Sequence, residues 1–156
     1  NDVSNSRDNH MTALCARHGA GIVLMHNEAG HNTPAQVRVY FEEALAMAQH
    51  DGLPIECVCL DPGIGFDKDR EEDVRLIAQL PAIMQDLPAA LLVGASRKRV
   101  VGAFCGNPPF AERLPGTLAI HTAAQLGGAH ILRVHDVAAA VQAAAVTDAF
   151  KRDLQH

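Results

Sequence analysis

The residue whose type and position most clearly suggest a chemical role is Asp61, which directly follows the apolar run from 58 to 60. We expect its carboxylate to be partly buried. A buried carboxylate without a partner is costly, so it requires a ligand or a neighbour that donates hydrogen bonds. Pro62 stiffens the turn that follows, while Gly63 and Gly65 let a ligand approach the backbone closely. The plain alternative is an Asp that caps a helix before a glycine-rich turn.

Two further groups predict an anion site. Arg133 and His135 are separated by one residue near the end of an apolar run, so on a strand they face the same side. Asp136 is expected to begin a helix, whose N-terminus also favours negative charge. The alternative for this pair is a salt bridge and a packed core histidine.

The segment Ser96-Arg97-Lys98 brings together a hydroxyl, two cations and the amides of a short helix that we expect to reach about Gly102. A solvated basic turn is the alternative. His26 and His31 are also possible metal ligands, but no acidic residue recurs near them at a ligand spacing. We therefore predict no metal ligand in this chain.

The composition limits the classes of protein to consider. The chain has 156 residues, of which 48% are hydrophobic and 20% charged, typical of a single globular domain over 1–156. No stretch approaches the roughly 20 apolar residues of a membrane-spanning helix. The net charge of −5 and the lack of a basic run argue against a nucleic-acid partner. The first residues do not form a signal peptide, so we expect a cytoplasmic protein.

The elements that position these groups alternate between strands and helices. Four short, continuous apolar runs are typical of parallel strands buried on both faces, at 21–26, 57–60, 89–93 and 130–135. Helices are expected between and after them, over about 34–51, 70–84, 117–126 and 137–151. One strand and helix about every 25–40 residues predicts a parallel sheet, either doubly wound or a (β/α)8 barrel.

The ends of two helices can be recognised. Thr33 with Gln36, and Asp69 with Glu72, each match a capping box. We expect the second of these helices to bury a stripe made of Val74, Ile77, Leu80 and Met84, and to bend or break at Pro81.

The reactive residue types all follow predicted strands, which places them at the carboxyl edge of the sheet. Ligands of parallel α/β folds bind at this edge, because the loops there are not needed to pack the core. The sequence therefore predicts one site, built from strand ends near Asn1, His26, Asp61, Gly94 and His135.

At these residues the sequence resembles the dihydropteroate synthases, a family of folate-pathway enzymes. A lone Asp-Pro-Gly-x-Gly-Phe is only moderately specific, but here the other family segments follow at the right distances and in the family's order. The matching segments are Asn1-Asp-Val-Ser, Leu24-Met-His26, Leu60-Asp-Pro-Gly-Ile-Gly-Phe66, Leu92-Val-Gly-Ala-Ser-Arg-Lys98 with Gly102, Glu112-Arg-Leu114 with Gly116, and Arg133-Val-His-Asp-Val137.

The resemblance implies an α/β fold of the (β/α)8 TIM-barrel type, of which this chain would supply about the last five β/α units. It also implies a reaction: 4-aminobenzoate is joined to 6-hydroxymethyl-7,8-dihydropterin pyrophosphate, giving 7,8-dihydropteroate and pyrophosphate. Mg²⁺ is the implied cofactor, with its protein ligand in the family's earlier strands. A homodimer is the expected assembly, and sulfonamides are the family's inhibitors.

The resemblance also implies roles for individual residues. Lys98, Arg133 and His135 match the residues expected to take part in catalysis, and the last two would bind pyrophosphate. Ser96 and Arg97 would contact 4-aminobenzoate. The residues that match the family's pterin site are Asn1, Met25, Asp61, Phe66 and Lys98.

Two features depart from the family pattern. Asp67 stands where the family usually has Gly, and we expect it to face solvent. The early strands of the barrel are missing, so five units would leave two open edges, and we expect negligible turnover from these residues alone. Two other functions therefore remain open: a non-catalytic fragment that binds pterin or assembles with another chain, and a methyltetrahydrofolate-binding methyltransferase barrel.

Overall fold

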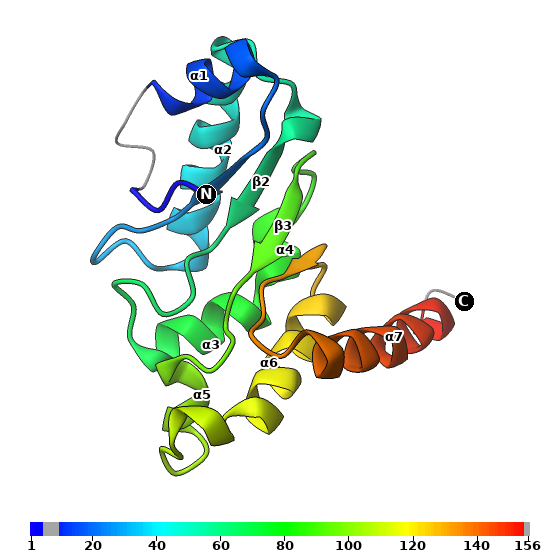
Figure 1. The fold of residues 1–156 in the computed structure, drawn as a ribbon. Coiled ribbons are helices and arrows are strands. Elements are labelled where there is room, and N and C mark those ends of the chain that lie inside the picture. The colour runs from blue at the N-terminus through cyan, green and yellow to red at the C-terminus, as the bar shows by residue number, and fades with distance from the viewer. Residues whose placement is uncertain (5–9, 155–156) are drawn as a thin grey trace.

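The computed structural model describes residues 1–4 and 10–154, and these contain a four-stranded sheet (Figure 1). The strands are all parallel and lie side by side in chain order. Asp2 forms a further parallel bridge with Leu24, which brings the start of the chain to the outer edge of the first strand. The strands are β1 (Ile22–Met25), β2 (Val58–Asp61), β3 (Ala90–Val93) and β4 (Ile131–Leu132).

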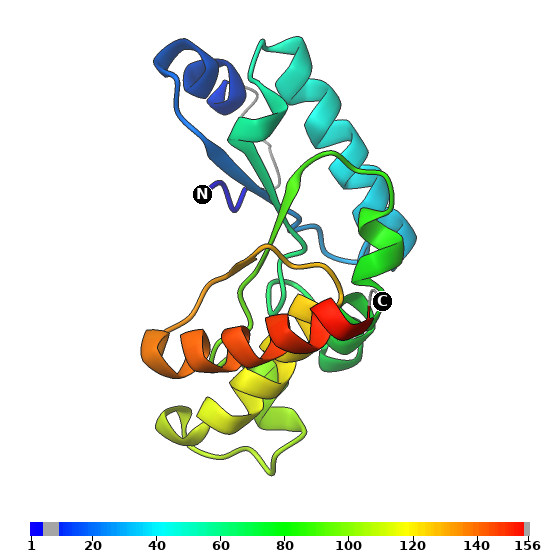
Figure 2. The ribbon, with the colours of Figure 1, turned by 90° about the vertical axis from the view of Figure 1, so that its right-hand side faces the viewer.

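Helices connect successive strands, as parallel strands require. Figure 2 shows α2 and α4 together on one side of the strands. The α-helices are α1 (Met11–His18), α2 (Pro34–His50), α3 (Arg70–Ala78), α4 (Leu80–Met84), α5 (Arg99–Ala103), α6 (Leu114–Leu126) and α7 (Val137–Leu154), and the two short 3-10 helices are η1 (Ile55–Cys57) and η2 (Phe110–Glu112). No helix in 1–4 or 10–154 is long and apolar enough to cross a membrane.

Side-chain alternation along the strands divides the sheet into two faces. Leu24, Leu60 and Leu91 belong to the main hydrophobic core, where they pack with residues of the helices. Their strand neighbours Met25 and Asp61 point to the other face, and the two are paired in the β1–β2 register. The first face packs against the helices and holds the sheet in place, whereas the opposite face carries a polar side chain, Asp61, at its carboxyl edge.

Both expected capping boxes are present. The Thr33 hydroxyl accepts the Gln36 N–H while the Gln36 side chain accepts the Thr33 N–H, and Asp69 and Glu72 repeat the arrangement at the start of α3. The expected break near Pro81 lies at Gln79, which ends α3 and precedes α4.

Two expectations about these elements are wrong in detail. Val74 of the expected stripe is 42% exposed, whereas Ile77 and Leu80 are buried as predicted, together with Asp73, Leu76 and Ile83. The last apolar run is a strand only at Ile131–Leu132, because the chain leaves the sheet after Leu132 to reach the start of α7.

Candidate functional site

The Asp61 carboxylate lies at the carboxyl end of β2 and is only 1% exposed. Its Oδ1 accepts the N–H of Gly63 at 2.8 Å, and its Oδ2 lies 3.5 Å from Nη2 of Arg133, which is 72 positions away in the chain. The buried carboxylate therefore accepts hydrogen bonds from two donors, as expected, and one of them is the predicted anion-binding arginine. The predicted residues of two distant strand ends meet on one rim of the sheet.

Burial raises the pKa of the Asp61 carboxyl, because the charged form loses water; the Gly63 N–H and the cations Arg133, Lys98 and Lys68 oppose this rise. An ionised carboxylate held in such a place is a strong acceptor, since little water competes for its lone pairs. Asp61 can therefore bind a ligand that offers two adjacent N–H donors.

Lys98 and Phe66 approach each other beside this carboxylate. The Lys98 ammonium lies 4.3 Å from the centroid of the Phe66 ring, and it donates to the carbonyl of Ile64. Gly65 is needed for this arrangement, because its φ is +79° and a Cβ there would lie 2.9 Å from the Lys98 side chain. Burial lowers the pKa of Lys98, with Asp61 opposing the change. The cation and the ring together offer a surface for a flat polar heterocycle.

The next rim segment connects β3 to α5 and contacts the residues just before α7. Ser96 is 5% exposed, and its hydroxyl lies 2.9 Å from Nδ1 of His135 and accepts the backbone N–H of the same residue. The Arg97 guanidinium forms two hydrogen bonds with the Asp136 carboxylate and lies 5.1 Å from the centre of the Phe110 ring. This segment is therefore not a solvated basic turn, and the Asp136 carboxylate, expected to cap α7, pairs with Arg97.

Arg133 and His135 do not lie on a regular strand as predicted, and they contact different groups. Arg133 packs across Gly94, where a Cβ would lie 2.8 Å from the guanidinium, and then reaches Asp61. The His135 ring contacts Ser96 and packs edge-on against Phe110 at 5.4 Å. Because the Arg133 side chain is 41% exposed, it can turn toward an incoming anion.

The two remaining predicted residues belong to the first strand ends. Met25 is fully buried and pairs with Asp61 in the β1–β2 register. Asn1 is exposed and precedes the Asp2–Leu24 bridge, so alternation places it on the same face as Met25. Both lie on the face that carries Asp61.

Two buried charged residues, Lys68 and Asp73, were not predicted from the sequence. Lys68 is 8% exposed, and its ammonium donates to the carbonyls of His26 and Phe66 at 3.3 and 3.2 Å. Asp73 is 2% exposed, and its Oδ1 accepts the Gly65 N–H at 2.7 Å. No local signal marked Asp73, because which face of α3 is buried depends on what packs against it.

Two histidines are buried beneath the rim. His26, at the end of β1, is 1% exposed and packs edge-on against Tyr40, while His121 of α6 is 2% exposed and accepts the N–H of Ala95. Burial lowers the pKa of each to about 4, and the charge of Lys68 adds to the effect at His26. Both rings are therefore neutral at pH 7, which suits packing and acceptance of a backbone N–H.

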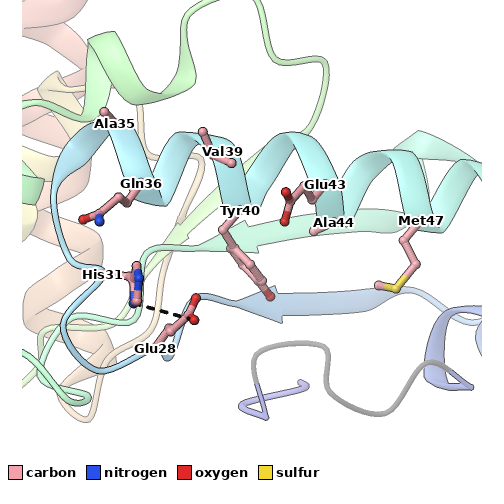
Figure 3. Close-up of a pocket in the computed structure, with 9 residues that line it drawn as sticks. All are labelled: Glu28, His31, Ala35, Gln36, Val39, Tyr40, Glu43, Ala44 and Met47. Carbon is pink, nitrogen blue, oxygen red and sulfur yellow. Dashed lines mark ion pairs between the residues drawn. The ribbon is translucent and has the colours of Figure 1, made fainter.

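A hollow of about 530 Å³ lies away from these residues, along α2 and the loop that precedes it. Figure 3 shows Glu28 and His31 at one end and Met47 at the other, with the Glu28–His31 ion pair at 3.7 Å. None of the predicted site residues lines it. The rim, with its convergent charges, is the better candidate site.

The described residues do not gather the ligands of a metal ion. Neither 1–4 nor 10–154 contains a group of three or more His, Cys, Asp or Glu side chains close enough to hold one. The Asp61 Oδ2 lies 3.5 Å from a guanidinium nitrogen of Arg133, so this carboxylate oxygen faces a cation already. The described residues therefore do not fit a Mg²⁺ ion held by their side chains.

Comparisons with known proteins identify the family of the chain. The sequence pattern of the pterin binding enzyme family matches residues 1–135. The dihydropteroate synthase of Synechocystis is 38% identical over 163 residues, covering 97% of this chain and 56% of the relative. The chain thus spans a little over half the length of that relative.

Solved structures show the same likeness. Dihydropteroate synthase from Xanthomonas albilineans with 4-aminobenzoic acid superposes with a TM-score of 0.88 at 35% identity, covering 96% of this chain and 58% of that one. The Thermus thermophilus enzyme in complex with 6HMPPP gives a TM-score of 0.87 at 40% identity, covering 95% and 60%. The parallel α/β fragment is therefore of the TIM-barrel type, as expected, and the chain belongs to the pterin binding enzyme family, with the dihydropteroate synthases as its relatives.

Proposed function

We propose that this chain provides the substrate-binding rim of a dihydropteroate synthase, which joins 6-hydroxymethyl-7,8-dihydropterin pyrophosphate to 4-aminobenzoate in folate biosynthesis. The observation that carries the proposal is the meeting of the buried Asp61 carboxylate with the Arg133 guanidinium at 3.5 Å. The carboxylate can accept hydrogen bonds from a pterin ring, and the guanidinium beside it can bind an anion. Two such groups so close together suit a substrate that carries a diphosphate beside a pterin. Relatives have been solved with 6HMPPP, 4-aminobenzoate and 7,8-dihydropteroate.

The pterin ring would be held by Asp61. A pterin offers an amino group and a ring N–H along one edge, and a carboxylate accepts both at once. Phe66 and Lys98 would flank the ring, since their 4.3 Å contact already pairs an aromatic face with a cation. Asn1 and Met25 would complete the pocket from the neighbouring strand ends.

The diphosphate would be held by Arg133 and His135. Arg133 is the more exposed partner of its ion pair, at 41% against 1% for Asp61, so it can add a phosphate contact without being pulled from the interior. His135 lies two residues before the start of α7, where the free N–H groups of the helix favour negative charge. These groups would stabilise the charge that develops on the leaving group.

The second substrate would enter beside Ser96 and Arg97. The Arg97 guanidinium, paired with Asp136 and packed on Phe110, is fixed in place, and the buried Ser96 hydroxyl lies next to His135. The carboxylate of 4-aminobenzoate is the group that such donors recognise. Sulfonamides, which share the shape of this substrate, would compete here.

The reaction forms a bond from the arylamine nitrogen to the pterin methylene carbon and breaks the bond from that carbon to the diphosphate oxygen. The electron pair of the broken bond leaves with pyrophosphate, and the amine releases one proton to solvent. A neutral arylamine needs little help from a general base at pH 7. The chain therefore acts mainly by orienting the ring and by stabilising the leaving group, with Arg133, His135 and Lys98 as the catalytic residues.

We further propose that Mg²⁺ arrives with the diphosphate, that the protein is cytoplasmic and that it forms a homodimer. The exposed apolar side chains of α7 support the last point: Val137, Val141, Val146 and Phe150 are each more than half exposed. Sedimentation velocity at several protein concentrations tests it. A single monomeric species at the highest concentration would exclude the dimer.

Calorimetry on the 156-residue chain tests the function. The wild type should bind a dihydropterin, and bind inorganic pyrophosphate more tightly once the pterin is present. Asp61→Asn should lose the pterin, while Arg133→Ala should lose mainly pyrophosphate. Equal losses of both ligands in both variants would contradict the proposed division of the rim.

A further inference from the structure

The loop between Gly63 and Phe66 is held by four ionisable side chains. Along this loop, amides donate to carboxylates and carbonyls accept from lysines in strict alternation. The contacts are the Gly63 N–H to Asp61, the Ile64 carbonyl to Lys98, the Gly65 N–H to Asp73, and the Phe66 carbonyl to Lys68. Every residue of the loop therefore has one backbone group bound by a charge.

The four side chains fall into two pairs with different prospects. Asp61 and Lys98 face the rim and are the pair to which the proposed function assigns the pterin. Asp73 and Lys68 hold the loop from behind, since Asp73 projects from the buried face of α3 and Lys68 also binds the carbonyl of His26 at the end of β1. Only the first pair is placed to exchange a backbone partner for a ligand.

The loop needs such support because its backbone is crowded. Gly63 and Gly65 have φ values of +69° and +79°. A Cβ at Gly63 would lie 2.0 Å from the carbonyl oxygen of His26 and 3.2 Å from the Lys68 ammonium, so the loop, the end of β1 and Lys68 are in direct contact. Flexible glycines do not maintain such a close approach by themselves.

We propose that Lys68 and Asp73 are positioning residues, which hold the Gly63–Phe66 loop in its binding shape while Asp61 and Lys98 release backbone groups to bind the pterin. The inference deepens the proposed function and rests on it for the identity of the ligand. It assigns no contact with substrate to Lys68 or Asp73. Their effect is transmitted through the Gly65 amide and the Phe66 carbonyl.

Hydrogen exchange of the Gly65 amide in the ligand-free chain tests the loop without any ligand. Asp73→Leu removes the acceptor and should speed this exchange at least tenfold, whereas Asp73→Asn keeps an oxygen acceptor at the same place and should restore it to within threefold of wild type. The amides of β3 give the internal reference for global folding, because the hydrogen bonds of Asp73 and Lys68 go to Gly65, Phe66 and His26. Unchanged exchange in Asp73→Leu would overturn the inference, whatever the chain binds.

Pterin affinity then tests the consequence for binding. Lys68→Met and Asp73→Leu should each lower the affinity for a dihydropterin at least tenfold. Asp73→Asn should lower this affinity less than threefold, and Glu71→Gln, at an exposed neighbouring position, should leave it unchanged. If the wild type binds no pterin, the proposed function fails while the exchange result stands. If the wild type binds and Lys68→Met and Asp73→Leu bind equally well, the positioning role is wrong and the proposed function survives.

Discussion

Two parts of the rim handle charge in different ways. In the β2 rim, made of Asp61, the 63–66 loop, Lys68 and Asp73, buried side chains bind backbone groups. The β3–β4 rim is made of Ser96, Arg97, Arg133, His135 and Asp136. Its side chains bind other side chains rather than backbone carbonyls, and all of them except Ser96 are more exposed.

This difference indicates which half of the rim already has its binding shape before a ligand arrives. Lys68 and Asp73, which bind backbone groups in the interior, cannot rearrange without leaving polar groups unpaired, so they keep the β2 rim in one shape that suits a rigid ring. Partly exposed pairs exchange partners at little cost, so the β3–β4 rim is suited to an anion that arrives and leaves. Variants in the two regions should therefore fail in different ways.

The largest effect is expected at Asp61. Asp61→Asn replaces one of the two acceptor oxygens by a donor, so a ligand with two adjacent N–H groups meets a mismatch. We expect dihydropterin to bind at least 100-fold more weakly, about 3 kcal/mol. Fluorescence titration measures it. Asp67→Asn is the matched control, because Asp67 is exposed near the same loop. A loss below tenfold in Asp61→Asn would remove the carboxylate from the ring site.

The pH dependence of stability should show His121 of α6, which is buried beneath the rim. The pKa of His121 is about 4 in the folded chain against 6.5 in the unfolded chain, so its contribution is complete above pH 6.5 and is lost as the pH falls toward 4. Between pH 7 and 5 this amounts to about 2 kcal/mol in the free energy of unfolding.

Urea unfolding of wild type and His121→Gln at pH 7 and pH 5 measures this contribution by difference. The comparison is necessary because Asp61 and Asp73, whose pKa values are raised by burial, change stability in the opposite sense over acidic pH. Parallel pH profiles for the two proteins would show that His121 is not held neutral.

A smaller effect is expected from the exposed cation. Arg133→Ala should lower the affinity for inorganic pyrophosphate about tenfold and the affinity for dihydropterin less than threefold, because the guanidinium binds the anion and only borders the ring. Calorimetry at low and high ionic strength should show that salt reduces the pyrophosphate affinity of the wild type more than that of the variant. Arg99→Ala, an exposed arginine on α5, is the control. A larger loss for pterin than for pyrophosphate would reverse the assignment of the two rim halves.

The smallest effect is expected at the Arg97–Asp136 pair. Asp136→Asn weakens the support of the Arg97 guanidinium but leaves its contact with Phe110, so we expect 4-aminobenzoate to bind three- to fivefold more weakly. Competition with a sulfonamide measures this affinity. Unchanged binding would show that Phe110 alone is enough to orient Arg97.

Most of the elements could be predicted from the sequence because their signals are local. The capping boxes at Thr33 and Asp69 and the break before Pro81 depend on neighbours within a few positions, and the structure has them all. The exposed Val74 and the buried Asp73 could not be predicted in the same way. Which face of α3 is buried depends on what packs against it, and Asp73 is accepted there because Gly65 supplies a donor.

What the sequence alone determined is that strands end where the reactive residues begin, because an apolar run followed by a polar turn ends a buried strand wherever it lies. Only the tertiary structure decided which charges meet. Arg133 could have paired with Asp136, three residues away, but the guanidinium crosses Gly94 to Asp61, and Arg97 takes Asp136 instead. Such choices depend on the spacing of neighbouring strands and on the missing side chain of one glycine, and neither is a property of any short segment.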